Sequence, residues 1–324
     1  MAAAAAMDHL EVSTDDDDSS DYSSSFTQSS THSITSSIVD YVYENGRRYH
    51  RYQEGKYMLP NDEAEQDRLD LYHHHELLTL HGNLYVAILP VKPQRILDCG
   101  TGTGIWALDI GEVFPSAEVI GVDLSPIQPE WVVPNVRFEV DDLEMDWTYH
   151  PDYFDFIHSR NIAQSIQDWP RYVRQIHTKP GGYIELAETS TRIYSDDESL
   201  TGSTLGLYNE KFNKALEIAG LMFPTGETLK KFAKAAGFVD VKVHSIKQPW
   251  GSWPKDPEIK RRGIIAAMIC TTGLESYGMA PLTRYMGMKP EEVLKMCVNS
   301  MVEVDSRKVH AYTILYHVVG RKLE

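Results

Sequence analysis

The sequence of 324 residues has few cysteines, no long apolar run, and no lysine or arginine among its first 46 residues. Its three cysteines, Cys99, Cys270 and Cys297, are an odd number without paired spacing. This excludes a small disulfide-stapled domain and indicates a reducing compartment, so we expect a cytoplasmic or nuclear protein that is not secreted. No run of about 18 apolar residues occurs, and we therefore predict no membrane-spanning helix.

The missing basic residues make the charge uneven along the chain. Residues 1–46 contain nine acids, whereas the remaining 278 residues contain 31 basic and 38 acidic side chains, a net charge of −7. Proteins that bind nucleic acid usually present a basic face to the phosphates. The mildly acidic body therefore argues against direct binding of nucleic acid.

Residues 1–40 are predicted to form a disordered tail. Residues 13–37 include 15 Ser or Thr and five Asp, and such a segment cannot bury enough apolar surface to offset the entropy of ordering it. It lacks the basic start and apolar centre of a secretory signal. One interpretation is a solvated tail, and the alternative is a regulatory arm that is phosphorylated.

Residues 41–94 are predicted to be a helical N-terminal segment. Asp62 and Glu65 have the spacing of a capping box, so a helix is expected to begin there. His73, His74 and His75 are consecutive and point in different directions on a helix, which argues against a metal site. Residues at helical spacing predict one buried stripe, formed by Leu69, His73, Leu77, Leu80 and Leu84.

From residue 95 onward, short apolar runs alternate with amphipathic stretches. Strands are predicted at residues 95–98, 118–123, 136–140, 154–159 and 183–188, with helices at 103–113 and 168–178. This alternation is typical of parallel βαβ units in a doubly wound α/β fold. The strand at 136–140 alternates apolar with charged residues, as an edge strand does.

A further helix is predicted at 227–236, and further strands are predicted at 239–247 and 311–320. Two insertions, near 189–225 and 249–308, interrupt the pattern with helices at 203–219, 257–276 and 290–304. Each insertion follows a strand, so each can cover the carboxyl end of the sheet, where ligands bind in such folds. We therefore expect one domain at 95–324 with a helical lid.

The lid is rich in large apolar side chains, and six of the 11 methionines fall between Met268 and Met301. These features predict an adaptable lid over an aromatic or apolar small molecule. The alternative is that the side chains simply pack the added helices. The aromatic residues concerned are Tyr194, Tyr208, Phe212, Phe223, Trp250, Trp253, Tyr277 and Tyr285.

A glycine-rich loop follows the first strand of the sheet. Asp98, Gly100, Thr101, Gly102 and Gly104 belong to a D-x-G-x-G-x-G pattern that opens a helix. Such glycines let a ligand approach the backbone, and the helix start binds anions. A dinucleotide-binding loop would have its third glycine at position 105, which is isoleucine. The acid suits an ammonium and a sulfonium, as in S-adenosyl-L-methionine, better than a pyrophosphate.

Acids also follow the second and third strands. Asp123, followed by Leu124, is expected to accept hydrogen bonds from a ribose diol. Asp141 or Asp142 is expected to accept from an adenine amino group beside Leu143, and we favour Asp142. Each acid has an alternative role as a loop residue. If Asp123 awaits a ligand, its replacement should leave the stability of the free protein almost unchanged.

Four segments resemble the fungal LaeA-like methyltransferases, which belong to the class I S-adenosylmethionine-dependent superfamily. They are Pro60–Asp70, Asp98–Trp106, Phe154–Arg160 and Pro180–Leu186. The resemblance covers most of residues 40–320. It implies a Rossmann-like fold with seven strands, mostly parallel, and S-adenosyl-L-methionine as cofactor. The family includes regulators of secondary metabolism and enzymes that methylate metabolites, so the resemblance does not identify the acceptor.

The residues that perform chemistry are harder to identify, because methyl transfer needs in-line positioning above all. Ser159, at the end of the fourth strand, is expected to border the cofactor. His158 is a candidate general base or a structural histidine. Arg160 is a candidate for orienting an acidic group or for pairing with Asp155, and Glu188 is a further catalytic candidate.

The sequence therefore predicts a methyltransferase that acts on a small-molecule acceptor. The first alternative is a regulatory protein that acts through protein partners, with a protein acceptor or none. The second, a nicotinamide oxidoreductase, is disfavoured by Asp98 and Ile105. A closed, ligand-sized cavity beside the methyl group favours the enzyme, whereas an open or filled cavity favours the regulator.

Overall fold

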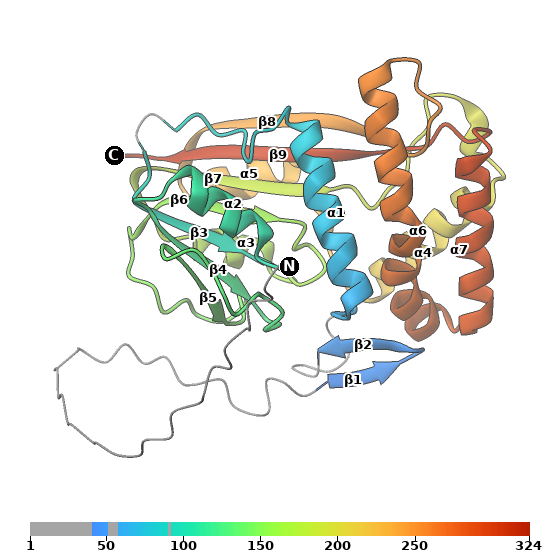
Figure 1. Ribbon diagram of the computed structural model, residues 1–324, viewed down its shortest axis with the longest axis horizontal. Coiled ribbons are helices and arrows are strands. Elements are labelled where there is room, and N and C mark those ends of the chain that lie inside the picture. Colours follow the sequence, from blue (N-terminus) through green and yellow to red (C-terminus); the bar gives the residue numbers. More distant parts are fainter. Residues whose placement is uncertain (1–40, 51–57, 90–91) are drawn as a thin grey trace, which may run out of the picture. The chain divides into compact units, whose positions relative to one another are not determined.

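The strands of the central sheet are β3 (Arg95–Cys99), β4 (Glu118–Asp123), β5 (Val136–Val140), β6 (Phe154–Arg160), β7 (Thr178–Thr189), β8 (Phe238–Pro249) and β9 (Tyr312–Lys322). The computed structural model describes residues 41–50, 58–89 and 92–324, and the predicted tail lies outside the described residues. The strand order is β5-β4-β3-β6-β7-β9-β8, with β9 antiparallel to both neighbours and the first five strands parallel (Figure 1). The predicted fold class is confirmed.

The predicted strands agree with the sheet, and the differences have local causes. β5 is an edge strand, as predicted from its alternating pattern. The helix predicted at 168–178 is shorter: α3 (Trp169–Arg174) ends early because β7 already begins at Thr178, which pairs with Phe154. The position of β9 between β7 and β8 was not predicted, because nothing local in a strand identifies its distant partners.

Helices cover both faces of the sheet. α2 (Ile105–Val113) packs Trp106 and Ile110 against one face. α3 and α5 (Gly226–Ala235) pack Trp169 and Leu229 against the other. Burial of such side chains drives the layers together, at roughly 1.5–3 kcal/mol for each large one. The carboxyl ends of the parallel strands lie beyond these layers.

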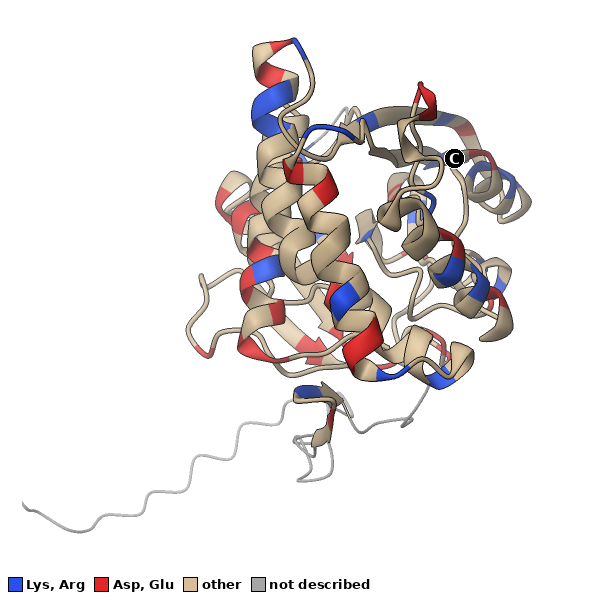
Figure 2. Ribbon diagram, turned by 90° about the vertical axis from the view of Figure 1, so that its right-hand side faces the viewer, with Lys and Arg blue, Asp and Glu red and all other residues tan. Residues whose placement is uncertain are grey.

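The predicted insertions supply a short helix, η1 (Glu198–Leu200), and three longer ones: α4 (Thr204–Ile218), α6 (Pro257–Met286) and α7 (Pro290–Asp305). The three longer helices pack against one another (Figures 1 and 2), and acidic and basic residues are interspersed over them. α6 continues past its predicted end at 276, through Pro281, because Met279 and Leu282 are buried in the helical cluster. Within the described chain, no helix combines the length and apolarity needed to cross a membrane.

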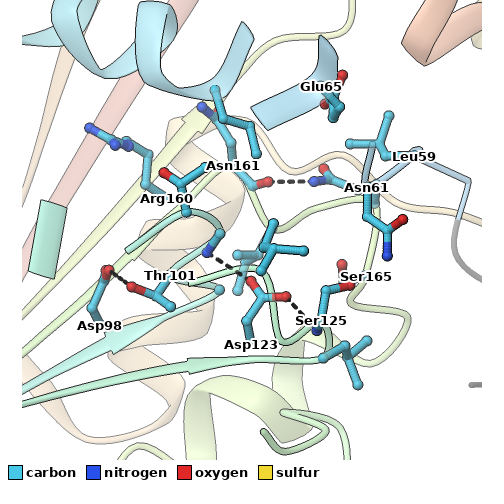
Figure 3. A pocket seen from close by; sticks show the side chains of 18 of the residues that line it. Leu59, Asn61, Glu65, Asp98, Thr101, Asp123, Ser125, Arg160, Asn161 and Ser165 are labelled. Carbon is cyan, nitrogen blue, oxygen red and sulfur yellow. Dashed lines mark hydrogen bonds between the residues drawn. The ribbon is translucent and has the colours of Figure 1, made fainter. Parts of the chain in front are cut away.

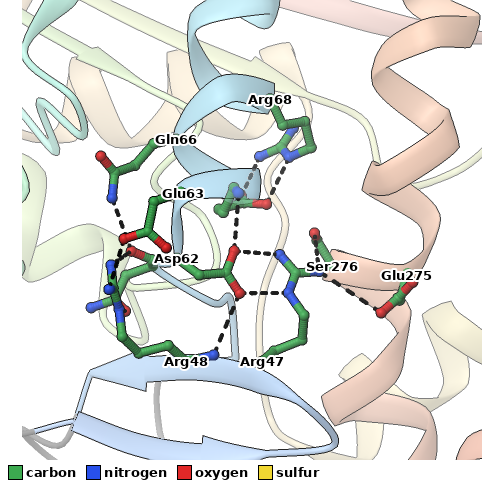
Figure 4. Close-up of polar contacts among 10 residues, drawn as sticks. Arg47, Arg48, Asp62, Glu63, Gln66, Arg68, Glu275 and Ser276 are labelled. Atoms are coloured by element: carbon green, nitrogen blue, oxygen red, sulfur yellow. Dashed lines mark hydrogen bonds and ion pairs between the residues drawn. The ribbon is translucent and has the colours of Figure 1, made fainter.

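A hairpin that was not predicted precedes the first long helix. β1 (Tyr41–Glu44) and β2 (Arg47–His50) pair around Asn45 and Gly46, which both have positive φ. A left-handed backbone conformation at both positions is typical of tight hairpin turns. Arg47 donates to both oxygens of Asp62, at 2.6 and 2.9 Å, and to Ser276 of α6 at 3.1 Å (Figure 4). The hairpin is thereby joined to two helices.

α1 (Glu63–Thr79) begins as predicted, with Asp62 accepting from the N–H of Glu65 at 3.1 Å. The predicted buried stripe is correct only at His73, because its leucines are half-buried. The buried face of α1 is polar: Arg68 is paired with Glu65 within the helix, and His73 with Asp109 of α2. The fully buried residues are Glu65, Arg68, His73, His75, Glu76 and Thr79.

A buried ionic cluster joins α1 to the sheet. Glu185 of β7 accepts from the N–H groups of Val86 and Ala87, each at 2.8 Å, and lies 2.8 Å from Nδ1 of His317 on β9. The other ring nitrogen of His317 lies 3.7 Å from Glu76 of α1. Burial lowers the pKa of His317, but the two carboxylates outweigh burial and raise it to about 9. His317 is therefore charged between two acids at neutral pH.

Candidate functional site

The carboxyl ends of four strands, β3 to β6, surround a hollow that we call the strand-end hollow (Figure 3). Its empty volume, including its mouth, is about 1160 Å³. It gathers predicted residues from distant parts of the sequence, because parallel strands end at the same edge of the sheet. Those residues are Asp98, Gly100, Thr101, Gly102, Asp123, Leu124, Asp141, Asp142, Leu143, His158 and Arg160.

The glycines of the loop after β3 have different roles. A Cβ on Gly100 would lie 2.2 Å from a methyl group of Ile162, so this position needs glycine for close packing. Gly102, at φ +58°, has room on the hollow side, where Leu69 would be 3.5 Å away. Gly104 does not line the hollow as predicted. It precedes α2 in a left-handed conformation, and a Cβ there would collide with the ring of Phe138.

Asp98 lies at the floor of the strand-end hollow and is held by two protein donors. Thr101 Oγ1 donates to one oxygen at 2.6 Å, and His158 Nδ1 lies 2.8 Å from the other. The ring of His158 stacks on Trp106, with centroids 3.8 Å apart. These contacts favour a structural role for His158 over that of a general base. Each carboxylate oxygen keeps a lone pair for a ligand cation.

Asp123 ends β4, and both of its oxygens accept from backbone N–H groups. Oδ2 accepts from Gly102 at 2.8 Å and Oδ1 accepts from Ser125 at 2.9 Å. Burial raises the pKa of Asp123, although these bonds partly oppose that effect. The carboxylate therefore joins the glycine loop to the loop after β4, a role that the sequence did not predict. Its remaining lone pairs face the hollow beside Leu124.

The residues predicted after the third strand lie at the hollow, whereas Ser159 of the fourth strand does not. Asp141, Asp142 and Leu143 line the strand-end hollow, and the structure does not favour one acid over the other. Ser159 does not line it: the alternation of β6 turns its side chain to the opposite face, beside Tyr172 of α3, with 0% exposure. The structure therefore does not bring the Ser159 side chain together with the other predicted cofactor-binding residues.

Residues of α1 and of the chain just before it close the strand-end hollow from above, and the sequence analysis missed them. Arg68 donates twice to Glu65, at 2.6 and 2.9 Å, and its guanidinium lies over the ring of Tyr277 at 5.1 Å. Leu59 and Asn61 also line the hollow. The signal was present, because these residues fall in or beside the Pro60–Asp70 segment that carries the family resemblance.

Arg160 projects into the strand-end hollow and belongs to a chain of polar contacts. Its guanidinium donates to Nδ1 of His73 at 3.1 Å, and Nε2 of His73 lies 2.9 Å from Asp109. Burial and Arg160 lower the pKa of His73, so the ring is neutral. The alternative pairing of Arg160 with Asp155 is wrong: Asp155 lies at the other end of β6 and pairs with Lys179.

A second hollow, which we call the lid hollow, adjoins the first. Its empty volume, including its opening, is about 900 Å³. Five residues line both hollows: Arg68, Tyr72, Asn161, Gln164 and Tyr277. The predicted lid residues that line it are Tyr208, Phe212, Phe223, Trp250 and Tyr277. The lid helices therefore border a partly open hollow that adjoins the strand-end hollow.

The methionines of the lid do not have the predicted role. Among the described residues that line the lid hollow there is no methionine. Met279 is buried between the lid helices, and Met296 and Met301 pack against the same cluster. Tyr194 stacks on Tyr312 instead of facing the hollow. The alternative interpretation, that these side chains pack the added helices, is correct for Met279, Met296 and Met301, whereas Met268 is exposed.

Glu188 projects from the end of β7 into the lid hollow. One oxygen accepts from the N–H of Ile162 at 2.8 Å, which fixes the carboxyl group beside the loop after β6. Burial raises the pKa of Glu188 to about 8, against the opposing effect of backbone donors. A carboxyl group that titrates near neutral pH in an apolar hollow is suited to proton transfer.

The residues of the strand-end hollow fit the predicted cofactor, S-adenosyl-L-methionine. Gly102 leaves room for close approach, and Asp123 presents lone pairs at the tip of β4 for a ribose diol. Asp98 offers a carboxylate to an ammonium group. Arg160 offers a cation to a carboxylate, because its hydrogen-bond partner, His73, is neutral. The donor set thus matches a ligand that carries both charges.

Comparison with known proteins agrees with this geometry. Residues 72–243 match the family described as "Methyltransferase domain". Methyltransferase pytC of Aspergillus terreus is 41% identical over 290 residues, 88% of this chain and 89% of that protein. Secondary metabolism regulator LAE1 of Cochliobolus heterostrophus is 38% identical over 86% of this chain and 94% of its own length.

Two further similarities extend the comparison. Protein-methionine methyltransferase laeA of Emericella nidulans is 32% identical over 86% of this chain and 76% of that protein. Phosphoethanolamine N-methyltransferase 2 of Haemonchus contortus, solved with S-adenosyl-L-methionine, has a TM-score of 0.45 and 18% identity, covering 78% of this chain and 53% of that one. With the family match spanning more than half of its length and relatives covering most of it, the chain belongs to the LaeA-like family of S-adenosylmethionine-dependent methyltransferases.

Proposed function

We propose that this methyltransferase acts on a neutral, largely apolar small molecule that occupies the lid hollow. The observation that carries the proposal is the adjacency of the two hollows, which share Arg68, Tyr72, Asn161, Gln164 and Tyr277. A ligand-sized space lined by aromatic side chains and opening beside the cofactor site is the usual form of a small-molecule site. The name of the relative pytC, a methyltransferase, agrees with this proposal.

Glu188 is the proposed general base of the reaction. S-adenosylmethionine, when bound, supplies an electrophilic methyl group on a sulfonium. The carboxylate form of Glu188 accepts the proton that an acceptor hydroxyl releases as its oxygen bonds to the methyl carbon. The N–H of Ile162 holds the carboxyl group in place throughout. Apolar walls around the hollow exclude water and keep the reacting groups aligned.

The second candidate function is that of a regulator with a protein acceptor or none. The names of the relatives LAE1 and laeA favour it, since one is called a secondary metabolism regulator and the other a protein-methionine methyltransferase. A regulator without a small-molecule acceptor has no need of the lid hollow. Transfer of a radioactive methyl group to proteins of an extract, with none to small molecules, would support this alternative.

S-adenosylhomocysteine is expected to raise the melting temperature of the protein, because it binds the folded chain alone. At about 100 times its dissociation constant, the free energy of unfolding should rise by about 2.7 kcal/mol. Differential scanning fluorimetry with NAD as the control ligand measures this effect. An unchanged melting temperature at millimolar S-adenosylhomocysteine, for protein shown to be folded, would contradict the cofactor assignment.

Replacing Glu188 with glutamine is expected to lower kcat by about 10²- to 10⁴-fold, because the amide cannot take a proton. The wild-type rate should rise with pH as the carboxylate forms near pH 8, and the variant should lose this rise. The assay is mass spectrometry of a panel of phenols and hydroxyketones incubated with S-adenosylmethionine.

The matched control for this substitution is Glu210→Gln, which makes the same chemical change on the exposed side of α4. It should leave both the rate and its pH profile unchanged. Equal rates and equal pH profiles for Glu188→Gln and the control would show that Glu188 is not the base. Binding of S-adenosylhomocysteine should be retained in both variants.

A further inference from the structure

Most polar side chains that line the lid hollow already have partners within the protein. Tyr208 donates to the carbonyl of Leu274 at 2.7 Å, and the amide of Asn209 donates to the carbonyl of Thr191 at 2.7 Å. In the same way, Arg68 is paired with Glu65, Tyr72 with Thr189, and Trp250 with Thr313. These groups hold the walls of the hollow and contribute little to the recognition of a ligand.

Two buried side chains of the lid hollow differ from this pattern. His75 of α1 is 1% exposed, and neither of its ring nitrogens has a partner at normal hydrogen-bond distance and angle among the described residues, the backbone of Arg262 being its nearest acceptor. Gln248 of β8 is 4% exposed, and its Nε2 also has no such partner among the described residues. An unmet buried polar group costs about 1–3 kcal/mol. Groups of this kind call for an explanation, and both line the same hollow.

The protonation of His75 determines what it can recognise. Burial lowers its pKa, as does the nearby charge of Arg262, while Glu76 and the Arg262 backbone act in the opposite direction. The ring is therefore neutral, with one donor and one acceptor nitrogen. The amide nitrogen of Gln248 only donates. A ligand that satisfies both must present hydrogen-bond acceptors, at least one of which accepts without needing to donate, as a carbonyl oxygen does.

We propose that His75 and Gln248 form a polar recognition pair that binds oxygen atoms of the acceptor away from the atom that is methylated. With Glu188 receiving the hydroxyl proton, the substrate class is a neutral hydroxyketone with an apolar, ring-containing body. The carbonyl oxygen accepts from this pair, and the aromatic walls contact the rings. This inference rests on the proposed function, since it concerns the ligand of the same hollow.

A matched pair of probes tests the inference: 4-hydroxybenzophenone and 4-benzylphenol, which differ by a carbonyl in place of a methylene. Calorimetric titration of protein saturated with S-adenosylhomocysteine should show the ketone bound at least about tenfold more tightly. A site with unmet donors discriminates against an analogue that lacks the matching oxygen. In His75→Phe and in Gln248→Leu the preference should fall at least threefold, and in the double variant it should vanish.

A second measurement needs no acceptor. Replacing an unmet polar group by an apolar one of similar shape is neutral or stabilising, so His75→Phe and Gln248→Leu should not lower the melting temperature of the free protein. The control is Asn209→Leu, in the same hollow, whose amide is bonded to Thr191 and accepts from Ile193. This control should lower the melting temperature.

The outcomes separate the inference from the proposed function. Equal binding of the two probes, no binding of either at millimolar concentration, or variants as unstable as Asn209→Leu would each overturn the recognition pair. In those cases S-adenosylhomocysteine should still bind, and Glu188→Gln should still lower the rate. Failure of S-adenosylhomocysteine to bind, or methylation of proteins alone, would instead contradict the proposed function.

Discussion

Asp123→Ala is expected to weaken the binding of S-adenosylhomocysteine by roughly 30- to 1000-fold. The side chain offers a ribose diol two charge-assisted hydrogen bonds, and their loss costs about 2–4 kcal/mol after allowance for solvent and non-additivity. The free protein should also lose about 1–3 kcal/mol of unfolding free energy, because the N–H groups of Gly102 and Ser125 lose their acceptor. Titration calorimetry and urea unfolding measure the two effects.

The loss of stability corrects the expectation drawn from the sequence, which treated Asp123 as a carboxylate that awaits a ligand. Asp123→Asn also becomes less conservative, since its NH₂ group faces a backbone donor that needs an acceptor. The control is Asp67→Ala, an exposed acid of α1. If the unfolding curve of Asp123→Ala coincides with that of the wild type, the bonds from Gly102 and Ser125 to Asp123 contribute nothing to stability. Affinity within about threefold of the wild type, under ~0.7 kcal/mol, would show that Asp123 does not bind the ribose.

Glu185→Ala is expected to destabilise the protein by about 3–5 kcal/mol, because it leaves a buried cation without its closest acid. The substitution also removes the acceptor of two backbone N–H groups, those of Val86 and Ala87. Urea unfolding measures the loss. Both N–H groups donate to the same carboxylate oxygen, so Glu185→Gln keeps an amide oxygen for both of them and should cost less. Similar stabilities for the alanine variant and the wild type would contradict the account of the buried cluster.

The same cluster makes stability depend on pH in a defined direction. Glu185 and Glu76 raise the pKa of His317 to about 9 against the effect of burial, so its contribution is complete below about pH 6.5 and is lost as pH rises through 9. Burial alone would raise the pKa of Glu76, but His317 outweighs it and lowers that pKa to about 2, so the contribution of Glu76 is lost as pH falls from about 4.5 towards 2.

Wild-type protein should therefore lose up to roughly 3 kcal/mol relative to His317→Gln between pH 6 and pH 10. Unfolding free energies of the two proteins at a series of pH values measure this difference. Parallel curves would indicate that His317 is neutral in the folded protein.

The site could be predicted where its signals are local in the sequence. The glycines after β3 and the acids after β4 and β5 lie next to strands that the apolar runs identify, so their convergence follows from the fold. The polar face of α1 could not be predicted in this way. The partners of Glu76 and His73 are His317 on β9 and Asp109 on α2, far away along the chain. Spacing within one helix cannot reveal such pairs.

Ser159 and the lid methionines show a second limit of predicting the site from the sequence. A strand end is identified by its composition, but which of its side chains faces the ligand depends on the phase of the pleat, and Ser159 is turned to the α3 side. Methionine in an added helix packs equally well against a ligand or against a neighbouring helix. Met279 does the latter, and only the three-dimensional packing decides between them.

The wall shared by the two hollows links their ligands thermodynamically. Arg68 and Tyr72 of α1 and Tyr277 of α6 line both spaces, so a ligand on either side contacts the same three side chains. Any adjustment of these side chains that the first ligand requires is already made when the second ligand arrives. The second ligand then binds more tightly, and the factor by which the cofactor improves acceptor affinity equals the factor by which the acceptor improves cofactor affinity.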